Sequence, residues 1–358
     1  MIKNNLVSII IPVYNEEKYI ENCLNSVLQF KKPKGIDFEI IIGDGYSTDN
    51  TLSIVKNFQK RHENIILFNN PKRFQSFAMN MALKHSQGFY ILRLDAHSEY
   101  PINYLKLCYE SLIQNNADNA GGVFITRSGS DTYSGNLVQA ISTHKFGVGD
   151  ASFRTEEVSG IADTVPFGFY KRSIFNKIGY FDERLIRCQD YEFNKRIISS
   201  NGKIWRNPEI KVYYYNQPNL YSFLRKQYKV EAPFNPYLWY LAPYAFTFRH
   251  AITGFFSLGF LVGIILLIFD LYLKYIFIGV MMLYAFLALG ASIQQSLRFS
   301  NFKLIFALPI SFFLFHFTHG LGILKGLILL LSKSSPVRNL NEPWKGAGRF
   351  HGLKNYKF

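Results

Sequence analysis

Three acidic residues each follow a short run of β-branched and aromatic residues in the first hundred positions. They are Glu16, Asp44 and Asp95. If the three runs are strands of an open α/β sheet, their carboxyl ends lie at the edge where such sheets bind ligands. We therefore expect the three carboxylates to stand at one ligand site.

The tetrapeptide Leu94-Asp95-Ala96-His97 places a carboxylate and an imidazole two residues apart. In extended chain, residues two apart face the same side, so Asp95 and His97 can address one point. A carboxylate and an imidazole with open coordination positions suit Mn²⁺ or Mg²⁺, which would bridge a diphosphate and neutralise its leaving charge. The alternative interpretation is a solvent-exposed turn after a strand.

The second acidic position lies in the turn Gly43-Asp44-Gly45-Tyr46-Ser47-Thr48-Asp49. The two glycines would allow close approach of a ligand, and Asp49 or Ser47 could cap the following helix. Taken alone, such a turn is more often a cap than a catalytic site. We expect ligand contact at Asp44 and capping around Asp49.

The elements that position these residues alternate strand and helix. Between the strands, apolar residues repeat at helical spacing in two segments, 20–28 and 74–82, and each makes one apolar stripe. This order predicts an α/β fold with a mostly parallel sheet. The predicted strands are 7–13, 38–42, 65–68, 89–94 and 120–126, and a later helix is expected at about 190–200.

Charge is distributed unevenly along the 358 residues. Residues 1–240 carry 29 Lys and Arg against 23 Asp and Glu, whereas residues 241–358 carry 11 against 2. Basic charge beside long apolar runs suits an anionic membrane surface, where each cation contributes about 1 kcal/mol. Nucleic acid is not expected as a partner, because the chain has no RNA-binding aromatic signature or zinc spacing.

Cysteine usage and the first residues indicate the compartment. Cys23, Cys108 and Cys188 are far apart and lack metal-ligand spacing, which fits a reduced, cytoplasmic environment. The apolar start has one preceding lysine and no small-residue cleavage site, so we interpret it as a buried strand and not as a signal peptide.

Three uncharged apolar stretches follow residue 240, at 251–269, 275–297 and 304–324. Each approaches the roughly 20 residues that cross a bilayer core. Aromatic residues before the first stretch resemble an interfacial belt, and prolines mark a linker. We expect a catalytic domain over 1–230, a linker over 231–250, two or three spans over 251–331 and a basic tail over 332–358. Tyr237, Trp239, Tyr240 and Tyr244 form the belt, and Pro233, Pro236 and Pro243 mark the linker.

Together these segments resemble the family 2 glycosyltransferases of the GT-A fold. The resemblance rests on Val7-Ser8-Ile9-Ile10-Ile11-Pro12-Val13-Tyr14-Asn15-Glu16-Glu17, on the turn 44–49 and on Asp95-Ala96-His97, and it covers roughly residues 5–230. Within the family the chain is most similar to membrane-attached exopolysaccharide enzymes such as succinoglycan glucosyltransferases. Those enzymes share the segment found here as Arg93-Leu94-Asp95-Ala96-His97, and they share apolar C-terminal spans.

The resemblance implies a Rossmann-like, nucleotide-sugar-binding domain followed by C-terminal transmembrane helices. It assigns donor binding to Pro12, Tyr14, Glu16, Asp44 and Asp95, with Glu16 and Asp44 on the nucleoside. It also assigns Asp95 and His97 to a divalent metal, Mn²⁺ or Mg²⁺, that contacts the diphosphate. The enzyme would be multi-pass in a bacterial-type inner membrane, with its catalytic domain in the cytoplasm.

The resemblance also assigns the catalytic base to Asp190. The family normally has Glu-Asp where this chain has Gln189-Asp190, so one negative neighbour is missing and any upward push on the Asp190 pKa is smaller. Without the resemblance, acids that open a helix are explained by the helix dipole. As a base, Asp190 would take the acceptor hydroxyl proton in a single inverting displacement.

The expected reaction is nonprocessive transfer from a nucleotide sugar, for which the resemblance suggests a UDP-sugar, to a lipid-linked or other membrane-associated acceptor in glycan synthesis. Processive members carry Gln-x-x-Arg-Trp, and the nearest segment here, 223–228, lacks the Trp. Two alternatives are a processive polysaccharide synthase and a catalytically idle nucleotide-sugar-binding membrane scaffold.

The third apolar stretch differs from the other two, because His316, Thr318, His319, Gly320 and Gly322 interrupt it. Broken backbone at membrane depth is tolerated only where it is buried or wet. By the positive-inside rule, the six cations of the tail favour the cytoplasm. We therefore expect 304–331 to bend near His319-Gly320 and re-enter. The alternative is a tilted span whose histidines hydrogen-bond to neighbouring helices.

Overall fold

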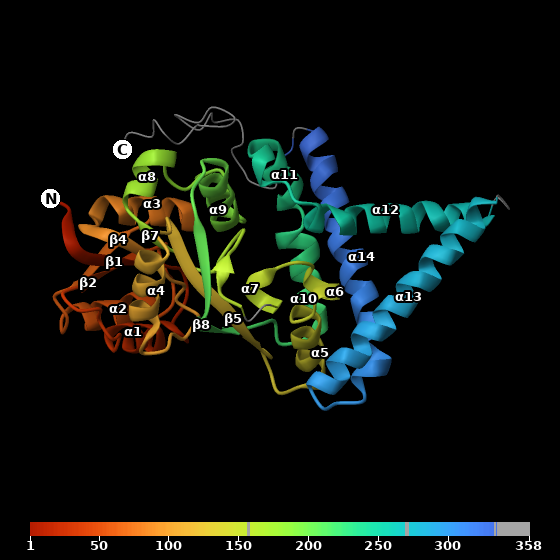
Figure 1. Ribbon diagram of the computed structural model, residues 1–358, viewed down its shortest axis with the longest axis horizontal. Coiled ribbons are helices and arrows are strands. Elements are labelled where there is room, and N and C mark those ends of the chain that lie inside the picture. Colours follow the sequence, from red (N-terminus) through yellow and green to blue (C-terminus); the bar gives the residue numbers. More distant parts are fainter. Residues whose placement is uncertain (156–157, 269–271, 333, 335–358) are drawn as a thin grey trace. The chain divides into compact units, whose positions relative to one another are not determined.

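The computed structural model describes residues 1–155, 158–268, 272–332 and 334. These residues form two compact units. The first comprises 1–125 and 158–214, and the second comprises 126–155, 215–332 and 334 (Figure 1). The predicted basic tail lies outside the described residues, apart from Ser332 and Ser334.

The elements of the first unit are β1 (Lys3–Val13), α1 (Ile20–Leu28), β2 (Asp37–Asp44), α2 (Thr51–Gln59), β3 (Ile65–Asn69), α3 (Gln75–His85), β4 (Gly88–Arg93), α4 (Tyr104–Gln114), β5 (Asn119–Arg127), β6 (Gly160–Ile161), β7 (Phe169–Lys171), α8 (Ser173–Ile178), α9 (Gln189–Ser199) and β8 (Ile204–Tyr215). Strands β5 and β8 end a residue or two inside the second unit. The second unit contains α5 (Tyr133–Ser142), α6 (Lys145–Val148), α7 (Ser152–Thr155), α10 (Leu220–Lys226), the π-helix η1 (Gln227–Glu231), α11 (Phe234–Leu241), the 3-10 helix η2 (Pro243–Ala245), α12 (Phe248–Ile268), α13 (Leu273–Arg298) and α14 (Leu304–Leu331).

The sheet of the first unit has the strand order β3-β2-β1-β4-β7-β5-β8-β6. Strands β1 to β4 pair in parallel, which confirms the predicted α/β fold. Strand β7 comes from later in the chain and lies between β4 and β5, antiparallel to both. The predicted strands correspond to β1 to β5, whereas the short β6 and β7 and the 12-residue β8 were not predicted.

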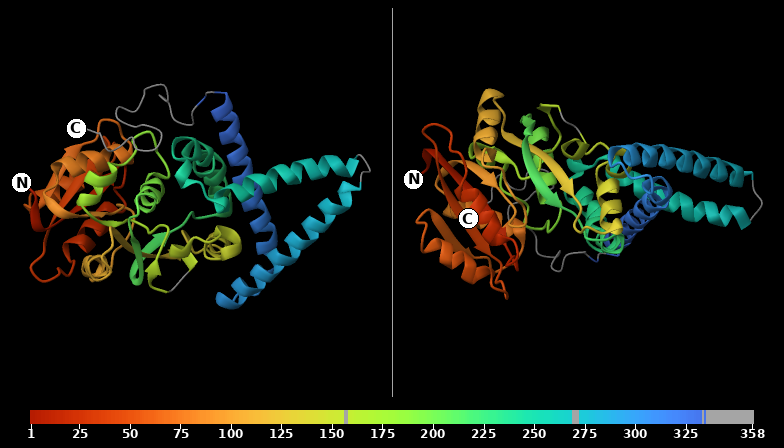
Figure 2. Two further views of the ribbon diagram at one scale, coloured as in Figure 1. Left: turned by 45° about the horizontal axis from the view of Figure 1, so that its top comes forward. Right: turned by 90° about the horizontal axis from the view of Figure 1, so that it is seen from below.

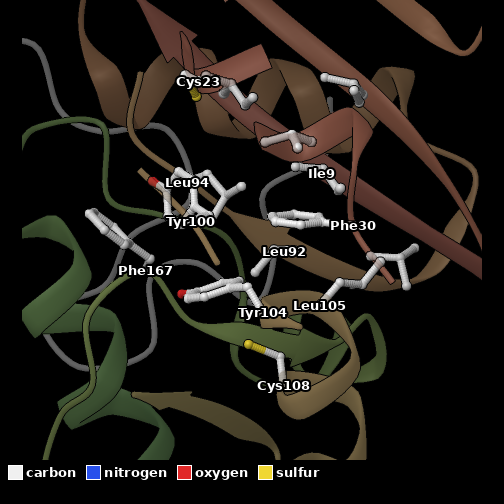
Figure 3. Packing of buried hydrophobic residues seen from close by; sticks show 14 of the residues in the cluster. Ile9, Cys23, Phe30, Leu92, Leu94, Tyr100, Tyr104, Leu105, Cys108 and Phe167 are labelled. Carbon is white, nitrogen blue, oxygen red and sulfur yellow. The ribbon is translucent and has the colours of Figure 1, made fainter. Parts of the chain in front are cut away.

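Strand β1 is buried on both faces. Ile9 and Ile11 pack with α1 and α4 in one core, and Ile10 packs with α3 and α9 in the other. Figure 3 shows the first of these cores around Ile9, with Cys23 and Cys108 among its members. Complete burial of such a side chain contributes about 1.5–3 kcal/mol to the stability of the fold. The strands whose ends carry the site are therefore held firmly in place.

The predicted apolar stripe of α3 is displaced by a residue or two. The sheet covers Met79 and Leu83 together with Ala78 and Ala82, whereas Phe77 is only half-buried. Lys72 lies over the Phe77 ring at 4.6 Å from its centre. The prediction placed Phe77 on the buried face because its side chain is large and apolar. In the structure the Phe77 ring is instead partly covered by Lys72.

In the second unit, α12, α13 and α14 are long and apolar enough to cross a membrane. Helix α14 is continuous over its 28 residues, so the predicted bend near His319-Gly320 is wrong. His316 Nδ1 lies 2.8 Å from the Tyr284 hydroxyl, and His319 Nδ1 lies 2.8 Å from Thr253 Oγ1. A Cβ at position 320 would lie 2.0 Å from the Thr253 carbonyl oxygen, so the glycine permits close helix packing.

The segment predicted as a linker is largely helical. It forms α11 and η2, and Tyr237 of the predicted aromatic belt is buried, whereas Tyr240 is half exposed. The first unit ends near residue 214, and the segment 126–155 packs with the C-terminal helices. The unit boundaries therefore differ from the expected division at residue 230.

Candidate active site

The predicted acids lie at the carboxyl ends of three adjacent strands, β2, β1 and β4. Strands β1 and β2 are in register so that Val13 lies opposite Asp44, the last residue of β2. Glu16 follows β1 by three residues, and Asp95 follows β4 by two. Because these strands are parallel neighbours, all three acids stand at one edge of the sheet, as the spacing predicted.

Asp44 is buried and its carboxylate organises the turn that follows. Its oxygens accept hydrogen bonds from the Ser47 amide at 3.2 and 3.3 Å and from the Ser47 hydroxyl at 2.6 Å. Asp49 accepts bonds from the Thr51 amide at 3.0 Å and the Thr51 hydroxyl at 2.6 Å, at the start of α2. These bonds lower the pKa of Asp49. Asp49 thus accepts from the first amide of α2, although the N-cap residue is Asn50, whose side chain makes no cap bond.

The glycines around Asp44 serve packing inside the protein. A Cβ at Gly43 would lie 2.6 Å from the Phe68 ring, and one at Gly45 would lie 3.3 Å from Tyr14 Cβ. A Cβ at either position would crowd a side chain of the protein itself, and the predicted close approach of a ligand stays a prediction. Tyr14 itself is 46% exposed, and Pro12 lies opposite Gly43 in the β1–β2 register.

Asp95, His97 and Glu16 converge at this edge. His97 Nε2 lies 3.9 Å from Asp95 Oδ2, and His97 Nδ1 lies 3.0 Å from Glu16 Oε1. The hydrogen bond that His97 donates to Glu16 raises the pKa of His97. When Nδ1–H donates to Glu16, the lone pair of Nε2 is free on the side of Asp95, which is the usual arrangement behind a metal-bound histidine.

The donor set fits a divalent cation that shares its shell with a substrate. Two ligand atoms that each lie about 2.1 Å from an ion can be up to about 4.2 Å apart, so the 3.9 Å separation of Nε2 and Oδ2 is compatible with one ion between them. Within the described residues, no group of three or more His, Cys, Asp or Glu side chains could hold a metal. Phosphate oxygens and water would therefore complete the shell.

A buried arginine that was assigned no role from the sequence connects the acids. Arg93 is 4% exposed; its Nη2 lies 2.7 Å from Asp95 Oδ1, and its Nη1 lies 3.3 Å from Asp190 Oδ2. Its guanidinium also lies 4.9 Å from the centre of the Phe167 ring. The sequence held one signal for this role. Arg93 stands two residues before Asp95, on the same face of the chain, and a buried arginine requires a carboxylate partner.

Asp190 lies in the first turn of α9, whose N-cap, Cys188, has a left-handed backbone with φ 64°. Its Oδ2 faces Arg93, whereas Oδ1 is buried and has no hydrogen-bond partner in the described part of the chain. Next to it, Gln189 Nε2 donates to Gln75 Oε1 at 2.5 Å, and Gln75 Nε2 donates to Asp95 Oδ1 at 2.9 Å. The structure thus brings Asp190 and Asp95 into one network.

Burial raises the pKa of Asp190, Arg93 opposes this shift, and the nearby charge of Asp95 adds to it. A negative residue at position 189 is therefore not needed for an upward shift. Glu192, the other acid of this turn, is buried and its Oε1 accepts from Arg196 Nε at 2.8 Å. Glu192 serves the packing of α9, whereas the Asp190 side chain is 28% exposed and its Oδ1 has no partner in the described residues.

Comparison with known proteins gives the family. Glycosyl transferase family 2 matches residues 8–179. A dolichyl N-acetyl-α-D-glucosaminyl phosphate 3-β-D-2,3-diacetamido-2,3-dideoxy-β-D-glucuronosyltransferase of Methanococcus voltae is 31% identical over 338 residues, which are 90% of this chain and 98% of that protein. The succinoglycan biosynthesis protein ExoA of Rhizobium meliloti is 28% identical over 214 residues, 59% of this chain and 64% of ExoA.

A solved structure extends the likeness of fold over most of the chain. The mannosyltransferase PcManGT from Pyrobaculum calidifontis, in complex with GDP-Man and Mn²⁺, has a TM-score of 0.52. It is 18% identical in sequence, and the match covers 91% of this chain and 87% of PcManGT. Sequence and fold agree with the acids at the sheet edge, and the chain belongs to the family 2 glycosyltransferases.

Proposed function

We propose that this glycosyltransferase moves one sugar from a UDP-sugar to a lipid-linked saccharide at the membrane, in a single inverting displacement. The observation that carries the proposal is the position of Asp190, whose side chain is 28% exposed and whose carboxylate is joined to Asp95 through Arg93. The lipid-linked acceptor is supported by the Methanococcus voltae relative, whose name specifies a dolichyl phosphate-linked substrate.

In this mechanism the Asp190 carboxylate accepts the proton of the acceptor hydroxyl as the hydroxyl oxygen forms a bond to the anomeric carbon. The bond from the anomeric carbon to the diphosphate oxygen breaks, and the diphosphate leaves with the electron pair. Arg93 holds Asp190 and Asp95 in fixed relative positions, since it contacts both. Such positioning aligns the attacking group before reaction.

Asp95 and His97 would hold the divalent cation, which supplies charge neutralisation on the leaving diphosphate. Glu16 orients His97 through Nδ1, and Gln75 and Arg93 bind the other oxygen of Asp95. Asp44 and Glu16 line the nucleoside side of the same edge. The exposed ring of Tyr14 offers a surface beside them.

Transfer of a single sugar is supported by the segment that replaces the Gln-x-x-Arg-Trp element. Here α10 passes into the π-helix η1, and the chain reads Gln227-Tyr228-Lys229-Val230-Glu231. The nearest segment to that element, 223–228, lacks the tryptophan that processive members carry.

The direct test supplies the purified full chain with labelled nucleotide sugars, Mn²⁺ and lipid extract from its own host. We expect an increase in acceptor mass of one sugar, with inverted anomeric configuration by NMR. A ladder of products would favour the processive alternative. Absence of both transfer and Mn²⁺-dependent donor hydrolysis, over a broad donor panel, would favour the idle scaffold.

Removal of the His97 imidazole should weaken the binding of the divalent cation without abolishing it, since Asp95 remains. We expect His97→Ala to raise the Mn²⁺ concentration for half-maximal transfer by at least about 10-fold, the loss seen even for residues that only orient a metal ligand. Titration of activity with Mn²⁺, Mg²⁺ and Co²⁺ measures the change. His85→Ala is the matched control, since His85 lies on the exposed part of α3; equal metal curves for both variants would contradict the assignment of His97.

A further inference from the structure

The N-terminal end of α14 packs against a part of the chain that precedes every apolar helix. The Tyr133 hydroxyl of α5 donates to the Lys303 carbonyl oxygen at 3.0 Å. Leu304, Leu308 and Phe312 of α14 share a buried cluster with residues of α5 and α10. Because α5 comes before the first apolar helix, this end of α14 lies on the side where the chain begins.

The C-terminal end of α14 also packs against chain that precedes the apolar helices. A Cβ at Gly322 would lie 2.7 Å from Ala232 Cβ, and one at Gly326 would lie 2.5 Å from the Pro233 carbonyl oxygen. Lys325 Nζ lies 5.1 Å from the centre of the Tyr228 ring of η1. Both ends of α14 thus contact segments that lead into α12.

The contact between α12 and α14 does not fit two helices that cross the same bilayer side by side. A Cβ at Gly254 would lie 3.0 Å from Ile323 Cγ2. At 1.5 Å per residue, Gly254 lies about 9 Å from the start of α12, whereas Ile323 lies about 29 Å from the start of α14. If both helices started at the inner surface of a core about 30 Å thick, these two residues would be about 20 Å apart in depth.

The side chains of α14 form a buried face and an exposed apolar face along the whole length of the helix. One face, which includes Leu304, Leu308, Phe315 and Gly326, is buried. The opposite face exposes Phe306 and Ile310 near one end and Ile328 and Leu331 near the other, and Phe313 and Phe317 between them contact Phe260 of α12. Figures 1 and 2 show α14 lying across the base of the α12–α13 pair.

We propose that α14 lies along the membrane surface, and that only α12 and α13 cross the bilayer, as a hairpin. The buried face of α14 rests on α5, α10, η1 and α11, and its exposed apolar face meets the lipid. Lys303 and Lys325 lie near the two ends of this helix, where their ammonium groups can reach anionic head groups. The chain after residue 332 would then stay on the side of the sugar-transfer unit, where the positive-inside rule places its cations.

The test is cysteine labelling of the full chain in intact cells with a membrane-impermeant maleimide. Three positions are probed singly: Tyr272→Cys before α13, Phe302→Cys before α14 and Ser332→Cys after it. Tyr272 is 90% exposed and Phe302 is 68% exposed, and Ser332 is also exposed. The unsubstituted chain is the control, since Cys23 and Cys108 are buried and Cys188 is partly exposed.

We expect Tyr272→Cys to be labelled from outside, and Phe302→Cys and Ser332→Cys to be labelled only after permeabilisation. Labelling of Ser332→Cys in intact cells would show a third span and overturn the proposal. Failure of Tyr272→Cys to label before permeabilisation would also overturn it, because the hairpin would not cross. The measurement does not require sugar transfer, so its result stands apart from that of the proposed reaction.

Discussion

The Asp190→Asn variant should lose turnover by about 10²–10⁴-fold, the range expected when a general base is removed. Donor binding should change little, because the proposed role of Asp190 is toward the acceptor hydroxyl and the asparagine oxygen can still contact Arg93. The amide keeps the shape of the side chain but cannot take the hydroxyl proton. Steady-state kinetics with varied acceptor, together with donor binding by calorimetry, separate the two effects.

The matched control lies two residues away, in the same turn of α9, at Glu192. Its carboxylate is buried and accepts from Arg196, so Glu192→Gln leaves the arginine with a weakened partner. Breaking a buried ion pair costs about 3–5 kcal/mol, which should appear as a lower melting temperature with turnover retained below it. If Glu192→Gln abolished turnover in folded protein and Asp190→Asn were mild, the base would have been assigned to the wrong acid.

The pH profile gives a second readout of the same base. Since burial raises the pKa of Asp190, the carboxyl becomes protonated at a higher pH than an ordinary aspartate, near 3.9. Turnover should therefore fall as pH decreases through this raised pKa, and it should be retained above it. The residual turnover of Asp190→Asn should lack this acid limb.

Much of the donor side of the site could be predicted because it depends on local sequence. Each acid follows a strand that is apolar enough to be recognised, and the topology of a parallel sheet brings the strand ends together. Asp49 could be assigned to the start of α2 because the bonds that satisfy the first amides of a helix are made within a few residues. The pair Asp95 and His97 follows from the alternation of side chains in extended chain.

The role of Arg93 depends on contacts across the fold and could not be read locally. Its partner Asp190 is 97 residues away and reaches it through α9. Strand β7 has three residues, too few for a period to be seen, yet it separates β4 from β5. The packing at Gly43 also could not be predicted from nearby residues, since the Phe68 ring that a Cβ would meet belongs to a neighbouring strand.

The histidines and glycines of α14 allowed two interpretations: a segment that bends and re-enters, or a continuous helix. Polar residues in an apolar stretch can mark a break, or they can bind across a helix contact. Tyr284 and Thr253, which bind the two histidines, lie in α13 and α12, at 32 and 66 residues' distance. The sequence of α14 alone contains neither partner, so the bend was a reasonable but wrong prediction.

Asp95→Ala should abolish transfer with every divalent cation tried. The change removes one of the two side chains that would hold the cation, and metal neutralisation of a leaving group contributes several kcal/mol. At 1.36 kcal/mol per tenfold in rate, the loss should be about 10³-fold or more. The assay is initial-rate transfer with Mn²⁺, Mg²⁺, Co²⁺ and Ca²⁺, each over a wide concentration range. Asp37→Ala, at an exposed ion pair with Lys32, is the control.

The interpretation requires a second measurement, because Asp95 also pairs with Arg93. Without Asp95, the buried guanidinium would have Asp190 as its remaining charged partner, and the base would be weakened as well. Asp95→Asn preserves the side-chain shape and one oxygen that Gln75 and Arg93 can still approach. Binding of Mn²⁺ by electron paramagnetic resonance in the presence of UDP, without turnover, then reports the metal site alone. If both Asp95 variants bind Mn²⁺ as tightly as the unsubstituted protein, Asp95 is not a metal ligand. A low transfer rate would then have to come from the link through Arg93 to Asp190.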